Sequence, residues 1–297
     1  MRRFLSYLLL ISVLPLLFSC GKAPEEAAPV NYHESFVWQR NRWDSCFQEL
    51  QKYLDPYVRQ DEMRTLDAAY VALLSAQDTS EESYTVPFDT YGVPCEARVQ
   101  RSQGHAKVNV FRNGVEVGVF TMDDTVFTIE STGIKIEANP LSVTSTEVHA
   151  DIVFSADGTT LATLDANGPM ELVEVAIDLP EGISLRGNVE VSRLWDAVRA
   201  IADEDTEEKV TPLVEEADAA IHVNVFYEGD LSTPHARVSL IPLHIFSRYD
   251  DYWTWRLIIR TDDGGILNDA WNGIGSLDDA SANFVLTWQH LLANILS

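Results

Sequence analysis

The carboxylate pairs near the C-terminus are the side chains whose type and spacing come closest to acid–base chemistry. Asp250-Asp251 and Asp262-Asp263 flank an aromatic run, and two carboxylates on either side of the scissile bond are the machinery of glycoside hydrolysis. However, Asp262-Asp263-Gly264-Gly265 also has the composition that a tight turn between strands requires. The turn accounts for these residues more simply, and we assign no catalytic residue.

Metal chemistry has two starting points in the sequence. The acidic run Asp203 to Glu208 offers the hard oxygen ligands that Ca²⁺ prefers, but it lacks the spacing and the central Gly of an EF-hand loop. His222 and His290 have no second ligand at a metal-binding spacing, so we expect satisfied or exposed imidazoles. The sequence therefore predicts a solvated acidic linker, no metal site and no cofactor.

Four large aromatic residues crowd one short stretch: Tyr249, Tyr252, Trp253 and Trp255. Exposed aromatic rings near carboxylates bind sugars by stacking on them. Because side chains alternate between the two faces of a strand, Trp253 and Trp255 share a face with Leu257 and Ile259, which is core patterning. Only Tyr249 and Tyr252 remain as candidates for contact with a ligand.

The mature chain would contain only two cysteines beyond residue 20, Cys46 and Cys95. An even pair in an oxidising compartment predicts one disulfide between them. The alternative is two separately buried thiols, because a sequence cannot place two Cα atoms within bonding range.

The compartment is indicated by the N-terminus. Arg2 and Arg3 precede an apolar run from Phe4 to Phe18, a pattern typical of a secretory signal. The run is shorter than the ~20 residues that a spanning helix needs, and Pro15 interrupts it.

The signal ends in Leu17-Phe18-Ser19-Cys20 and resembles that of a bacterial lipoprotein. The chain is similar to outer-membrane lipoproteins of Bacteroidota-type bacteria in this lipobox, in its acidic tether and in its strand–turn–strand units. The resemblance implies that Cys20 carries the lipid and becomes the mature N-terminus. It implies an outer-membrane location, on the periplasmic or the cell-surface face, and no activity.

Charge restricts the partners of the chain. The formal net charge is −25, and loss of Arg2 and Arg3 with the signal makes it −27. A field of this sign repels phosphate backbones, so we expect no nucleic-acid partner. The membrane would be reached through the N-terminal lipid, and a protein or a glycan is the remaining kind of partner.

Helical periodicity occurs near the N-terminus, in the middle and at the C-terminal end of the chain. Apolar residues recur at helical spacing over 34–76, broken by Asp55-Pro56, which predicts a helical hairpin. Residues 189–203 predict a central helix, Thr211-Pro212 predicts another helix start, and Ser276 begins the pattern of a last helix.

Strand patterns fill most of the remaining chain. The alternating runs 107–112 and 115–120 surround Asn113-Gly114, which is the strongest short signal for a hairpin. A second hairpin turns at Asp157-Gly158, and further strands follow at 170–178, 221–226, 236–246 and 252–261. The run Val108 to Gly114 reappears as Val223 to Gly229, either by duplication or by convergence on a common strand–turn pattern.

These patterns predict an α+β fold, mostly antiparallel sheet, with an N-terminal helical hairpin and a C-terminal covering helix. The expected organisation is a signal peptide (1–19), a tether (20–33), the helical hairpin (34–83) and the sheet with its central and C-terminal helices (84–297), the last two forming one domain. The leading functional hypothesis is a non-enzymatic binding or structural role in the cell envelope. The alternatives are a carrier of an apolar ligand between a curved sheet and its helices, and a carbohydrate-active surface protein.

Overall fold

The computed structural model describes most of the chain beyond the tether, and the α+β class with a mostly antiparallel sheet is confirmed in it. It describes residues 36–54, 60–76, 81–131, 133–202, 207–246, 251–261, 265–273 and 284–296. The helices of these ranges are α2 (Phe36–Leu54), α3 (Gln60–Ser75), α4 (Val191–Ala202), α5 (Glu207–Ala219) and α7 (Phe284–Leu296). None of the helices within these ranges is long and apolar enough to span a bilayer.

The strands are β1 (Ser83–Thr90), β2 (Val93–Ser102), β3 (His105–Arg112), β4 (Val115–Asp123), β5 (Val126–Ser131), β6 (Ile134–Val143), β7 (Glu147–Ala156), β8 (Thr159–Pro169), β9 (Val173–Leu179), β10 (Ile183–Val189), β11 (Ile221–Tyr227), β12 (Ala236–Phe246), β13 (Asp251–Thr261) and β14 (Ile266–Gly273). Neighbouring strands follow one another in sequence order, and pairs such as β1 with β2 and β9 with β10 are antiparallel.

The chain divides into two compact units whose segments alternate along the sequence. Unit 1 comprises Met1–Lys52, Val143–His149 and Ala162–Asp278, and unit 2 comprises Tyr53–Ser142, Ala150–Leu161 and Asp279–Ser297. Nearly all of α2 belongs to unit 1, and α3 belongs to unit 2.

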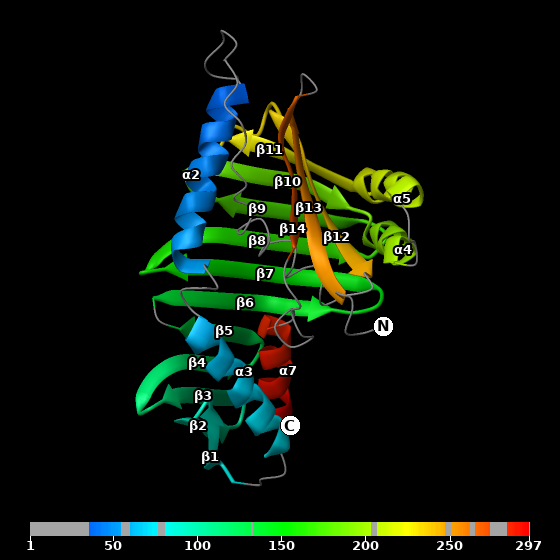
Figure 1. The fold of residues 1–297 in the computed structure, drawn as a ribbon. Helices are drawn as coiled ribbons and strands as arrows, with labels where there is room; N and C mark the ends of the chain where they lie inside the picture. Colours follow the sequence, from blue (N-terminus) through cyan, green and yellow to red (C-terminus); the bar gives the residue numbers. More distant parts are fainter. Residues whose placement is uncertain are drawn as a thin grey trace. The chain divides into compact units, whose positions relative to one another are not determined.

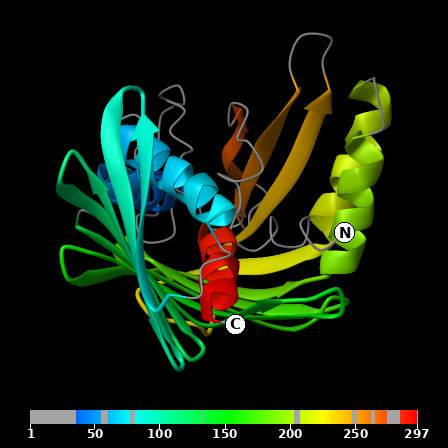
Figure 2. The ribbon, with the colours of Figure 1, turned by 90° about the horizontal axis from the view of Figure 1, so that it is seen from below.

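Unit 2 builds its core between a meander of strands and two helices. Helices α3 and α7 lie on the same face of β2 to β4 (Figures 1 and 2). Trp288 of α7 stacks on Phe120 of β4 with ring centroids 3.6 Å apart, and both side chains are buried. Gly118 lets α3 approach, because a Cβ there would lie 2.8 Å from Leu66 Cδ2. The C-terminal helix therefore packs on the sheet.

Unit 1 covers one face of its strands with α2, which runs across β9 to β11 (Figure 1). Trp43 of α2 donates a hydrogen bond of 3.1 Å from Nε1 to the Tyr227 hydroxyl, which itself donates to Gln39 Oε1 at 3.0 Å. Burial raises the pKa of Tyr227, so the hydroxyl keeps the proton that it donates. Arg42 adds contacts to Glu228 and to the carbonyl of Glu181. We call the strand face under α2 the inner face.

Tight turns follow the sequence signals closely. Asn113-Gly114 and Asp157-Gly158 both have positive φ at their two central residues, so the two predicted hairpins are confirmed. The turn Glu228-Gly229 has the same backbone signature. The two similar sequence runs thus end in the same two-residue turn, one in unit 2 and one in unit 1.

Helix boundaries differ from the prediction at one place. The helix expected to start at Thr211-Pro212 begins earlier, at Glu207, so Pro212 lies inside α5. Pro212 has no backbone N–H, so the helix lacks one intrahelical hydrogen bond there. The predicted start of the last helix at Ser276 lies outside the described residues.

Candidate functional site

Most of the site residues predicted from the sequence cannot be placed. Cys20 and Tyr249 lie outside the described residues. Tyr252, Trp253 and Trp255 belong to β13, but their side chains are not among those that the structure describes. On the same strand Leu257 and Ile259 are buried, as expected, and so is the intervening Ile258.

The two remaining cysteines are free, buried thiols in this structure, and the disulfide between them stays a prediction. Cys46 lies on the buried side of α2 in unit 1, where burial and the charge of Glu181 raise its pKa to about 12. Cys95 lies on β2 in unit 2, with its sulfur 3.4 Å from the carbonyl oxygen of Val93. Each thiol is buried within its own unit.

The sheet face opposite α2 is a polar surface of unit 1. Strand alternation puts Ile177, Leu185 and Val225 on the inner face, in register with one another, and it puts their neighbours on the opposite face. We call that side of β8 to β11 the polar face. Its polar residues are Thr163, Asp165, Asn167, Glu174, Asp178, Ser184, Arg186, Asn188, His222 and Asn224; Ala176 and Phe226 are its apolar members.

The strand register lines up four of these residues in one row. Asn167 lies beside Glu174, Glu174 beside Asn188, and Asn188 beside His222. Neighbouring strands are about 4.8 Å apart, so the row presents hydrogen-bonding groups at that spacing. At one end His149 Nδ1 is 3.0 Å from Asn167 Oδ1, and the Asn167 amide donates to Asp165.

A second group on this face is centred on Asp178. Its carboxylate accepts hydrogen bonds from Ser184 Oγ at 2.8 Å, from Arg186 Nη2 at 2.6 Å and from Thr163 Oγ1 at 3.3 Å. The Arg186 guanidinium also donates to the backbone carbonyl oxygens of Ile177 and Leu185. These contacts fix both charged side chains against the sheet.

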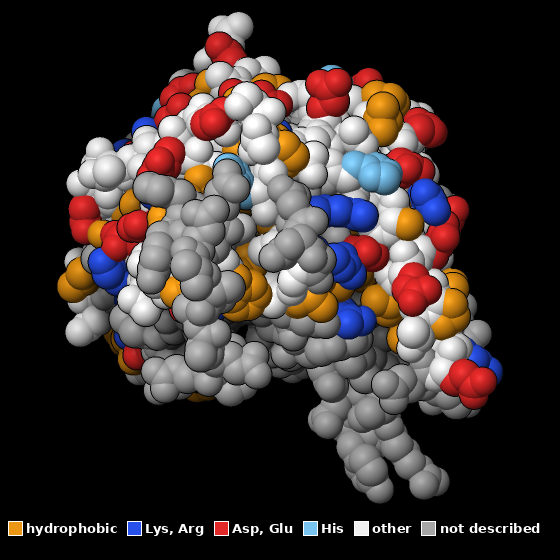
Figure 3. Space-filling view, turned by 90° about the horizontal axis from the view of Figure 1, so that it is seen from above, with side chains coloured by type: hydrophobic (Ala, Val, Ile, Leu, Met, Phe, Trp, Pro, Cys, Tyr) orange, Lys and Arg blue, Asp and Glu red, His pale blue; other side chains and the backbone are white. Residues whose placement is uncertain are grey.

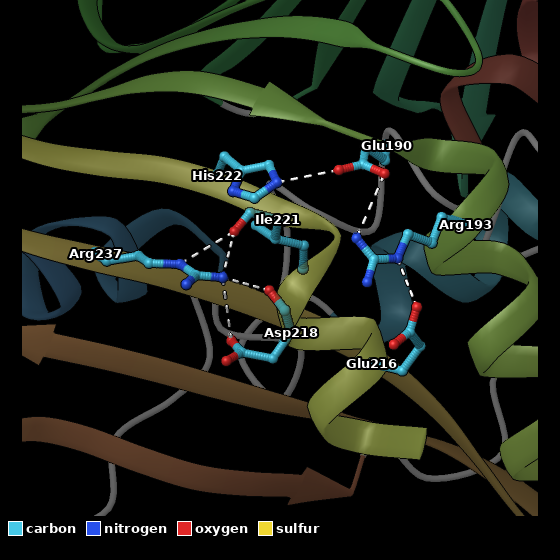
Figure 4. A network of polar contacts seen from close by, with 7 residues as sticks. All are labelled: Glu190, Arg193, Glu216, Asp218, Ile221, His222 and Arg237. Carbon is cyan, nitrogen blue, oxygen red and sulfur yellow. Dashed lines mark hydrogen bonds and ion pairs between the residues drawn. The ribbon is translucent and has the colours of Figure 1, made fainter. Parts of the chain in front are cut away.

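At its β11 end the row continues into a network that reaches α4 and α5 (Figure 4). His222 Nε2 is 3.1 Å from Glu190 Oε1, while Glu190 Oε2 is 3.5 Å from Arg193 Nη1. Arg193 Nε then donates to Glu216 Oε1 at 2.6 Å. The hydrogen bond with Arg193 lowers the pKa of Glu216, so this carboxylate stays ionised.

The lower half of Figure 4 shows the junction between α5 and the strands. Arg237 of β12 donates to the carbonyl oxygens of Ile221 and Asp218, which satisfies acceptors where α5 ends and β11 begins. Arg260 of β13 holds the Asp218 carboxylate at 3.0 Å. These contacts tie the helix end to three strands and have a structural role.

The chemistry available on this face is hydrogen bonding. His222 is an exposed imidazole with a carboxylate partner, which agrees with the expectation of satisfied or exposed histidines. Within the described ranges no group of three or more His, Cys, Asp or Glu side chains is arranged to hold a metal ion. Sequence reasoning missed the polar face, although the alternation of Thr163, Asp165 and Asn167 with apolar residues carries its signal.

Comparison of the chain with protein-family models and with curated proteins gave no match.

Proposed function

We propose that this protein is a lipid-anchored protein of the cell envelope that acts by binding, through the polar face of unit 1. The anchor rests on the lipobox Leu17-Phe18-Ser19-Cys20 and on the basic and apolar segment before it. We place the lipid on Cys20 and the protein at the outer membrane. We also propose that α2 and α3 form the N-terminal helical hairpin that the sequence predicts.

The anchor is tested by metabolic labelling with a palmitate analogue and by membrane fractionation. We expect the wild-type protein to be labelled and to sediment with membranes, and we expect Cys20→Ser to be unlabelled. A mass spectrum showing a mature N-terminus other than a lipidated Cys20 would contradict this part of the proposal.

The observation that carries the binding role is the composition and order of the polar face. Asn, Asp, Ser, Thr and His predominate on it, and these shorter side chains lose less rotamer entropy on binding than Lys or Glu do. The contacts of Asp178, Asn167 and His222 hold several of these groups in place before a ligand arrives. Groups held in advance lower the cost of association.

A ligand with many hydroxyl groups matches this surface best. Amides and hydroxyls both donate to and accept from sugar hydroxyls, and carboxylates accept from them. The row from Asn167 to His222 repeats hydrogen-bonding groups at about 4.8 Å. We therefore propose a glycan as the partner.

The experiment uses the soluble Cys20→Ser protein on an array of neutral and acidic glycans, followed by calorimetry of the hits. Asn188→Ala, in the centre of the row, should weaken binding about tenfold, the effect of losing one well-placed hydrogen bond. Asn109→Ala is the control, because Asn109 is also a half-exposed asparagine on a strand but belongs to unit 2. Equal loss in both variants, or no glycan bound at all, contradicts the proposal.

The inner face supports a second candidate, a carrier of an apolar ligand. Two inner positions of β8, Ala162 and Ala166, are small and buried, and small inward residues are what such a carrier needs. Mass spectrometry of protein purified without detergent tests this: a stoichiometric lipid supports the carrier, whereas ligand-free protein that takes up no fluorescent fatty acid contradicts it.

A further inference from the structure

We draw no further inference here: the strongest candidate, the exposed apolar surface of Val71 and Leu74 on α3 of unit 2, is an uncovered helix face, and nothing in the part of the chain that the structure describes shows what covers it.

Discussion

Asp178 is the most strongly held carboxylate of the polar face. Burial on its own would raise the pKa of Asp178, but hydrogen bonds from Ser184, Arg186 and Thr163, together with the charge of Arg186, lower it below 3.8 overall. A carboxylate whose pKa is lower in the folded state stabilises that state at pH values above its unfolded pKa. The stabilisation is lost as the pH falls from that value through the lower folded one.

Asp178→Asn should therefore reduce stability at neutral pH and have less effect in acid. Because the side chain is about half exposed, we expect a loss of about 0–1 kcal/mol at pH 7. Urea unfolding at several pH values measures it. The gap between wild type and variant should shrink below pH 3.8, and a gap that stays constant down to pH 2 would refute the account.

Two buried serines allow a matched comparison. Ser239 on β12 is fully buried and its hydroxyl has no hydrogen-bond partner among the described residues, whereas the Ser184 hydroxyl donates to Asp178. Since an unpaired buried hydroxyl costs free energy, Ser239→Ala should leave stability unchanged or raise it by about 1 kcal/mol. Ser184→Ala should lower it by about 1 kcal/mol. The midpoints of urea unfolding measure both effects. If Ser239→Ala is less stable than Ser184→Ala, the Ser239 hydroxyl is not unpaired.

The buried thiols predict a clear pattern of reactivity. Because burial and Glu181 raise the pKa of Cys46 to about 12, it carries almost no thiolate near neutral pH. In the Cys20→Ser protein a thiol reagent should react slowly at pH 8 and then titrate two thiols after unfolding without reductant. If no thiols titrate, Cys46 and Cys95 are joined by a disulfide and this prediction is wrong.

At the scale of elements, β1 is an edge strand of unit 2 that carries its own protection. Arg101 N donates to Glu82 O. Backbone groups alternate in direction along a strand, so Tyr84, Val86 and Phe88 also point their N–H and C=O groups toward β2. Pro87 is out of phase with them, and its nitrogen lies on the open side of the strand. A proline there removes one donor from an edge that would otherwise template pairing with another chain.

Restoring that donor should promote self-association. Pro87→Thr adds an N–H on the open edge with little added hydrophobicity, so we expect a concentration-dependent increase in mass by light scattering. Thr85→Val is the control, because Thr85 is also exposed and out of phase but already has its N–H. If Thr85→Val associates as strongly as Pro87→Thr, added apolar surface or lost polarity is the cause, and the explanation from the edge donor is wrong.

For the whole molecule, charge is the dominant feature. The chain carries 46 acidic and 21 basic residues, and the face in Figure 3 shows Asp and Glu side chains spread among fewer Lys and Arg. Like charges repel in the compact state more than in the unfolded chain, and salt screens that repulsion.

We therefore expect NaCl to raise the unfolding temperature. The rise should be largest up to about 0.1 M, where the Debye length falls to about 10 Å, and it should flatten above that. Differential scanning calorimetry measures it, with an equal osmolarity of sucrose as the uncharged control. A fall in unfolding temperature with NaCl would mean that the attractive pairs, such as Asp178 with Arg186, outweigh the repulsion.

The sequence predicted elements where local signals are strong. The helices α2, α3 and α4 and the strands around Asn113-Gly114 follow from periodicity and from turns that require positive φ. It did not predict β1 and β2, because Pro87 and Pro94 weaken their strand patterns. Those strands are stabilised by their partner β3 and by the packing of α3, which no local pattern reports.

What the sequence determined by itself is the class of the fold and the charge of the molecule, together with the signal that makes Cys20 the proposed anchor. These depend on composition and on interactions between near neighbours in the chain. Only the tertiary structure decided that Asn167, Glu174, Asn188 and His222 form one row. The row depends on strand register, because a shift of one residue moves every side chain of a strand to the other face.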